Sequence, residues 1–166
     1  MGHACPAKLD KLSASIPSSL TAFFQRLSEE IQRSKRSDTL LLAAVIDIQQ
    51  AKKIRVNYSY SIRNHLLTAV SNSLTKVLRP YDLICRFSDD QFCIAAGIDN
   101  RQDAEANLKR IYQALVNIQQ LVDEQIELYV DARIGGVLYN KELHLSVSHL
   151  VQDANYALSK AKSQSK

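Results

Sequence analysis

Leu40-Leu-Leu-Ala-Ala-Val-Ile-Asp-Ile48 is a continuous apolar, partly β-branched run that is broken by a single carboxylate, Asp47. Such a run predicts a central strand that is buried on both of its faces. A carboxylate at the end of this strand is costly to bury unless it is paired or reaches the surface. The run therefore defines the middle of a sheet, and Asp47 is the first candidate functional residue.

The spacing of apolar and turn-forming residues predicts the elements around this strand. Leu83–Phe87 and Phe92–Ala96 are short strands joined by Ser-Asp-Asp-Gln, a turn composition, so they form a hairpin. Ile126–Tyr139 is expected to be a strand or strand pair that is interrupted at Gly135-Gly136. Helices are expected at 17–37, 61–78, 104–118 and 147–161. This order predicts an α/β (α+β) sandwich, a palm-like, mainly antiparallel sheet flanked by helices.

Composition places the chain among soluble globular domains. Its 166 residues are 46% hydrophobic and 23% charged, which suits one domain with a core. The longest apolar run is too short for a membrane span of about 20 residues. Three cysteines without CxxC spacing favour a reducing, cytoplasmic location over a disulfide or zinc framework. Residues 1–16 are expected to be a flexible tail, 17–37 a lead helix and 38–166 the domain.

Two carboxylates are expected to meet at one end of the sheet. Asp47 closes the buried strand and Asp90 occupies the hairpin tip, and in an antiparallel palm these two places can be neighbours. Paired carboxylate oxygens, completed by water and substrate phosphates, suit Mg²⁺. The structural alternative for Asp90 is a tight turn, because turns also select the pair Asp89-Asp90.

Several strings of the sequence resemble the GGDEF domain of diguanylate cyclases. Arg79-Pro-Tyr-Asp82 precedes Arg86-Phe-Ser-Asp-Asp-Gln-Phe92 by the spacing at which that family places its R-x-x-D pair before its R-[YF]-G-G-[DE]-E-F hairpin. Ala154–Lys162 is similar to the family signature A-D-x-A-L-Y-x-A-K, and Arg133–Gly135 is similar to S-I-G. The resemblance covers residues 38–166. It implies a nucleotidyl-cyclase fold and the condensation of two GTP molecules into cyclic di-GMP by paired domains.

The resemblance also assigns site positions. It implies a metal position at Asp47, Ile48 and Asp90, so that Mg²⁺ is expected to bind weakly and not to be required. The positions that the resemblance assigns are Ser88, Asp89, Asp90, Gln91 and Phe92 for the hairpin motif, Arg55 and Asn64 for guanine, and Lys162 and Lys166 for phosphate.

Most of the catalytic positions are altered. Asp89 puts a side chain and a negative charge where a glycine lets the backbone approach the nucleotide. Gln91 replaces a carboxylate that the resemblance implies in catalysis, and Asn64 satisfies only part of what an aspartate accepts from guanine. We therefore expect an inherited fold in which no catalytic motif is intact.

The pair Arg79 and Asp82 is intact. In the family it forms the inhibitory site (I-site), where cyclic di-GMP binds away from catalysis. An arginine fork can donate twice to guanine O6 and N7, and an aspartate can accept from guanine N1–H and its amino group. Pro80 stiffens the turn between them. Arg110 is a second candidate contact. The alternatives are a local Arg79–Asp82 salt bridge and a surface role for Arg110.

The sequence thus predicts a catalytically degenerate GGDEF domain that acts as a regulatory cyclic di-GMP-binding module in bacterial second-messenger signalling. Two alternatives stay open: a weak or residual diguanylate cyclase, and a nucleotide-free dimerisation or interaction domain. The expected partners are cyclic di-GMP or GTP, a fused or separate sensory or phosphodiesterase domain, and a second copy of the chain. Nucleic acid is not expected.

Overall fold

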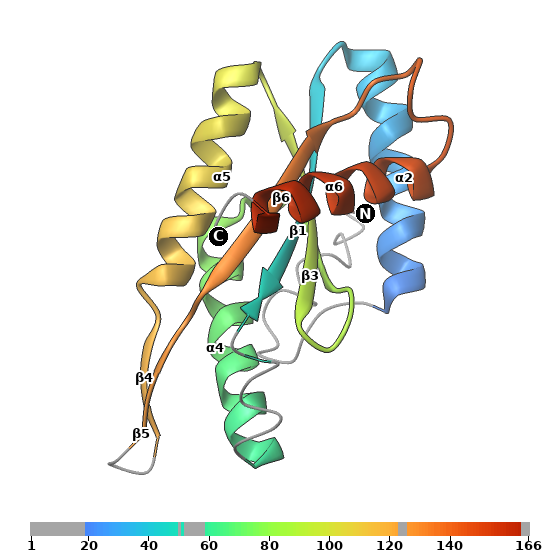
Figure 1. Ribbon diagram of the computed structural model, residues 1–166. Coiled ribbons are helices and arrows are strands. Elements are labelled where there is room, and N and C mark those ends of the chain that lie inside the picture. The colour runs from blue at the N-terminus through green and yellow to red at the C-terminus, as the bar shows by residue number, and fades with distance from the viewer. Residues whose placement is uncertain (1–18, 50, 52–58, 123–125, 164–166) are drawn as a thin grey trace, which may run out of the picture.

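The computed structural model describes residues 19–49, 51, 59–122 and 126–163. Figure 1 shows a central sheet with helices on both of its faces, which confirms the predicted α+β sandwich. The elements in chain order are α2 (Leu20–Ser37), β1 (Leu40–Ile48), α4 (Tyr60–Val77), β2 (Leu83–Arg86), β3 (Gln91–Ile98), α5 (Arg101–Val116), β4 (Gln119–Val122), β5 (Ile126–Tyr129), β6 (Ala132–Leu138) and α6 (Val147–Ser163).

The main sheet has the strand order β2-β3-β1-β6, and each neighbouring pair is antiparallel. The predicted central strand is confirmed at both of its ends, Leu40 and Ile48. In the register of this sheet, Asp47 lies between Gln91 of β3 and Arg133 of β6. The end of β1 therefore meets the start of the second hairpin strand.

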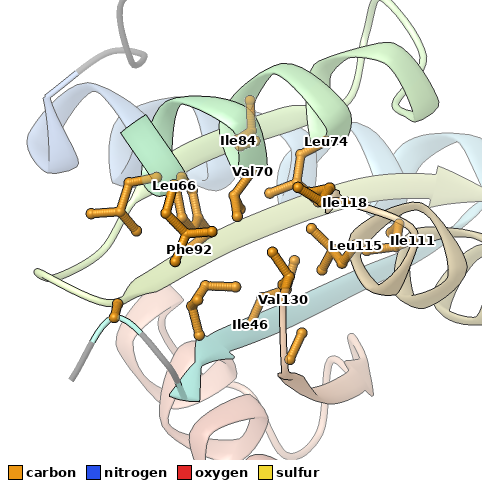
Figure 2. Packing of buried hydrophobic residues seen from close by; sticks show 14 of the residues in the cluster. Ile46, Leu66, Val70, Leu74, Ile84, Phe92, Ile111, Leu115, Ile118 and Val130 are labelled. Atoms are coloured by element: carbon orange, nitrogen blue, oxygen red, sulfur yellow. The ribbon is translucent and has the colours of Figure 1, made fainter. Parts of the chain in front are cut away.

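Alternate residues of β1 enter two separate cores, which explains why the strand is apolar throughout. One face packs against α4 and α5, and Figure 2 shows Ile46 and Phe92 inside this core. The opposite face packs against α2 and α6. The two sets are Ala44, Ile46 and Ile48 on the first face and Leu41, Ala43 and Val45 on the second. Asp47 continues the second set and so meets α6.

The lead helix begins at Leu20, three residues after the predicted start. Ser19 caps it, because its side-chain oxygen accepts a hydrogen bond from the Ala22 N–H at 3.3 Å. Asp38 ends it in the left-handed region, with φ at 55°. The predicted tail, residues 1–16, lies outside the described residues. Within the part of the chain that is described, none of the helices has the length and apolar character needed to cross a bilayer.

The predicted interruption at Gly135-Gly136 is wrong. Both glycines lie inside β6, paired with Val45 and Ala44 of β1, and the break between β5 and β6 falls at Val130-Asp131. Gly135 is required by packing, because a Cβ there would lie 2.5 Å from the Ala154 carbonyl oxygen of α6. The glycine therefore marks a close approach of helix to strand and does not mark a turn.

β4 is an element that the sequence analysis missed. It pairs with β5 as a separate two-stranded antiparallel sheet, which projects away from the main sheet in Figure 1. β4 begins soon after α5 ends. With four residues, it is too short to show a clear alternation of apolar and polar residues in the sequence.

Cys85 and Cys93 are buried partners across the β2–β3 hairpin. Burial raises the pKa of the Cys85 thiol from 9.0 to about 12, and burial with the nearby Cys85 also raises the pKa of Cys93. The folded-state pKa of Cys85 lies above its unfolded value. Its contribution to stability is therefore complete below about pH 9 and is lost as the pH rises toward about 12.

In a Cys5→Ser background, we expect the folded protein to react with iodoacetamide at least about tenfold more slowly than the same protein in guanidinium chloride. The reason is that the thiolate is the reactive species and the fold suppresses it. Mass spectrometry over a time course at mildly alkaline pH measures both rates. Equal rates in the two conditions would show that the hairpin opens readily, contrary to this expectation.

Candidate functional site

Asp47 is completely buried at the end of β1 and is surrounded by nitrogen donors. Lys162 of α6 brings its Nζ to 2.9 Å from Asp47 Oδ2. Gln91 Nε2 donates to Asp47 Oδ1 at 3.0 Å, and Gln49 Nε2 donates to Oδ2. The pairing that a buried carboxylate requires is therefore supplied by one ammonium and two amides. We call these four residues the Asp47 cluster.

The hairpin tip reaches the end of β1 through its backbone. The Ile48 N–H donates to the Asp90 carbonyl oxygen at 2.8 Å, so the strand end and the tip are neighbours, as the sequence predicts. The Asp90 side chain accepts from Ser88 Oγ at 3.1 Å. In the strand register, however, the residue opposite Asp47 is Gln91. Among the described residues, no three histidine, cysteine or acidic side chains gather in a way that could hold a metal.

Two arginines hold the backbone of the hairpin tip. Arg63 of α4, only 6% exposed, donates from Nη2 to the Asp89 carbonyl oxygen at 2.9 Å. Arg86 Nη2 donates to the same carbonyl oxygen at 3.0 Å, and its Nε donates to the Ser88 carbonyl oxygen. The Asp89 carboxylate also pairs with Arg63 at 3.4 Å. Two arginine side chains of the chain therefore fix the tip at Ser88 and Asp89, the positions where the resembled motif has glycines.

The R-x-x-D segment forms a tight turn between α4 and β2. The Asp82 N–H donates to the Arg79 carbonyl oxygen at 3.0 Å, and the Arg79 N–H donates to Asp82 Oδ2 at 2.7 Å. Asp82 is 5% exposed, whereas the Arg79 side chain is exposed. The turn lies at the opposite end of β2 from the hairpin tip, a separation of about 13 Å for a four-residue strand.

The remaining predicted positions are not gathered at the Asp47 cluster by any described contact. Arg110 is exposed on α5, and its Nη2 donates to Asn107 Oδ1 at 2.7 Å. Asn64 is half-buried on α4, in a hollow whose described lining comes from α4 alone. Arg55 and Lys166 lie outside the described residues.

Arg63 and Gln49 are site residues that the sequence patterns do not single out. A signal was present, because Arg63 lies three residues before Leu66 and seven before Val70, on the buried stripe of α4. A charged residue on an apolar stripe requires a partner, and here that partner is the hairpin tip.

Comparison with known proteins identifies the fold. A family model described as "Diguanylate cyclase, GGDEF domain" matches residues 16–166. The GGDEF domain of PA1120 (YfiN or TpbB) from Pseudomonas aeruginosa superposes with a TM-score of 0.83 at 23% identity, over 92% of this chain and 93% of that one. The GGDEF domain of DgcB from Caulobacter crescentus, solved in complex with c-di-GMP, gives a TM-score of 0.78 at 15% identity, over 87% and 84% of the two chains.

Among curated proteins, the cyclic di-GMP phosphodiesterase NbdA of Pseudomonas aeruginosa is 24% identical over 142 residues, which are 86% of this chain and 18% of that protein. The chain spans between 14% and 30% of the length of the curated relatives that it matches. These relatives are therefore longer proteins in which the matched domain is one part.

Proposed function

The chain belongs to the GGDEF domain family of cyclic di-GMP signalling, and from this premise we propose that it is a catalytically degenerate member that binds cyclic di-GMP as a regulatory module. The observation that carries the proposal is the Arg79–Asp82 turn, in which the exposed residue Arg79 extends from a backbone that two hydrogen bonds fix. The solved DgcB domain, which was crystallised with c-di-GMP, supports the choice of ligand.

The turn suits recognition of a guanine base. Two hydrogen bonds close it, and Pro80 restricts its backbone, so little conformational entropy is lost when a ligand binds. Arg79 can then place its two-pronged donor against O6 and N7 of a guanine. Asp82 both braces the turn and supplies negative charge beside the base. Arg110 is proposed as a further cationic contact from α5.

The Asp47 cluster supports a regulatory role over a catalytic one. Its carboxylate is already engaged by Lys162, the residue that the family resemblance assigns to phosphate. Gln91, in the place of a catalytic carboxylate, serves as a donor to the same group. Asp47 and Lys162, which the resemblance assigns to metal and to phosphate, are thus bonded to one another.

The partner domain is proposed from the relatives. NbdA is a cyclic di-GMP phosphodiesterase, and the matched region makes up 18% of its length. We infer that this domain regulates a fused or separate phosphodiesterase or sensory domain, and that this regulation depends on whether cyclic di-GMP is bound. Because the ligand has two guanines, one molecule or a stacked pair could also bridge the Arg79 sites of two copies.

Replacing Arg79 by alanine is expected to weaken binding of cyclic di-GMP by about tenfold or more, since a bidentate contact to guanine is worth about 1–3 kcal/mol. Arg79→Lys should recover little affinity, because an ammonium cannot reproduce the fork. Asp82→Asn keeps an acceptor for the Arg79 N–H and so should fold normally while binding less tightly. Isothermal titration calorimetry measures all three affinities.

Lys109→Ala is the matched control, because Lys109 is an exposed cation next to Arg110 on α5. If its loss weakens binding as much as the loss of Arg79, the attraction is general electrostatics and guanine recognition is absent. If the wild-type protein shows no affinity for cyclic di-GMP at high micromolar concentrations, the proposal is wrong and the interaction-domain alternative replaces it.

A further inference from the structure

At the metal position that the family resemblance implies, the described contacts of the Asp47 carboxylate are with nitrogen donors. Mg²⁺ requires oxygen ligands in near-octahedral geometry at about 2.0–2.1 Å. Both oxygens of Asp47 instead accept hydrogen bonds from nitrogen, and one of these donors is the Lys162 ammonium. With both of its oxygens engaged by nitrogen donors, Asp47 does not fit a resident divalent ion.

We propose that Lys162 is a built-in cation that replaces the divalent metal at the end of β1. The ammonium lies 2.9 Å from Asp47 Oδ2 and comes from the last turns of α6, so it also ties that helix to the central strand. The inference is independent of whether cyclic di-GMP binds at Arg79.

Charge balance in the Asp47 cluster explains why a single lysine suffices. Asp47 contributes one negative charge, Lys162 one positive charge, and Gln91 and Gln49 none, so the group is neutral as it stands. A glutamate at position 91 would add a second negative charge beside Asp47, and two close carboxylates favour a divalent cation between them. The amide of Gln91 removes that repulsion and adds a donor at 3.0 Å.

The burial of the two partners is unequal. The Asp47 side chain is fully buried, whereas the Lys162 side chain is 34% exposed. Removal of the lysine therefore leaves the buried carboxylate without the charge of Lys162. Removing one partner of a buried ion pair destabilises a protein more than replacing both partners does. A divalent ion that arrives from solvent could then take the position that the ammonium has left.

The test is thermal unfolding of the wild-type protein and of Lys162→Met, each in EDTA and in excess Mg²⁺ or Mn²⁺. The wild-type Tm is expected to be the same in EDTA and in metal. Lys162→Met is expected to lower the Tm in EDTA by about 6 °C or more. Added Mn²⁺ should restore a large part of this loss, and more fully in Lys162→Met combined with Gln91→Glu.

Three further variants keep the test decisive. Lys160→Met is the matched control, because Lys160 lies on the same helix over the exposed Tyr156 ring, and it should leave the Tm almost unchanged. Lys162→Arg keeps the charge and should retain most of the wild-type Tm. Asp47→Asn combined with Lys162→Met removes both charges and should be more stable than Lys162→Met alone.

Two results would overturn the inference. One is stabilisation of the wild-type protein by Mn²⁺, with a stoichiometry of one by calorimetry, to the same extent as the Lys162→Met variant. The other is an equal Tm for Lys162→Met and Lys160→Met, which would show that Asp47 does not depend on the lysine.

Discussion

Replacing Gly135 by alanine is expected to destabilise the fold by about 3 kcal/mol or more, near or above the upper end of the usual cost of overpacking. The new Cβ would lie 2.5 Å from the Ala154 carbonyl oxygen and would also overlap the Leu158 backbone nitrogen. Both obstacles belong to the backbone of α6, so no side-chain rotation can relieve them. The whole helix would have to move away from β6, and Lys162 would move with it.

Two other glycines provide graded controls for this prediction. The nearest atoms to a Cβ at Gly136 belong to flexible side chains, Leu108 at 2.7 Å and Leu42 at 3.5 Å, so Gly136→Ala should cost clearly less. A Cβ at Gly97 would meet nothing within 4 Å, so Gly97→Ala should be close to neutral. Chemical denaturation of the three variants measures the order. A Gly135→Ala protein as stable as Gly97→Ala would mean that α6 does not pack closely on β6.

Incubation with GTP and Mg²⁺ or Mn²⁺ is expected to give no detectable cyclic di-GMP. The loss of one preorganised contact can cost a factor of about 10²–10³ in rate, and several are missing here together. By the resemblance of the sequence, Asp89 and Gln91 stand where the family motif has a glycine and a carboxylate. In the structure, Arg63 donates to the Asp89 carbonyl oxygen and Lys162 pairs with Asp47. Chromatography of the reaction mixture measures product. Product that forms with the wild-type protein and disappears with Asp90→Ala would contradict this expectation.

The central strand and the helices could be predicted because each has a strong local pattern. Leu40–Ile48 was located to the residue, since its two buried faces leave no polar position except Asp47. The fate of Asp47 was predictable only in part. A buried carboxylate needs a partner, so the sequence predicts that one exists. It does not identify Gln91 and Lys162, which are 44 and 115 residues away along the chain. Only the register of the sheet and the path of α6 bring them to Asp47.

The glycines of β6 show why local propensity mispredicts a residue whose role is set by an element far away in the sequence. Gly135-Gly136 has the composition of a break and predicts one there. A glycine is required at position 135 because the backbone of α6 passes too close to β6 for any side chain. Arg63 is the reverse case, because its helical position is local while its partner, the hairpin tip, is brought near by the tertiary fold.

The position of β1 has a consequence for how the protein is made. Leu42 pairs with Ala96 of β3 and with Leu138 of β6, so the second partner leaves the ribosome 42 residues after the first. At about 5–20 residues per second, this delay is roughly 2–8 s. During that interval one edge of an apolar strand has unsatisfied backbone groups, the feature through which strands of other chains add to a sheet. The nascent chain is therefore most exposed to mispairing after β3 has been synthesised and before β6 emerges.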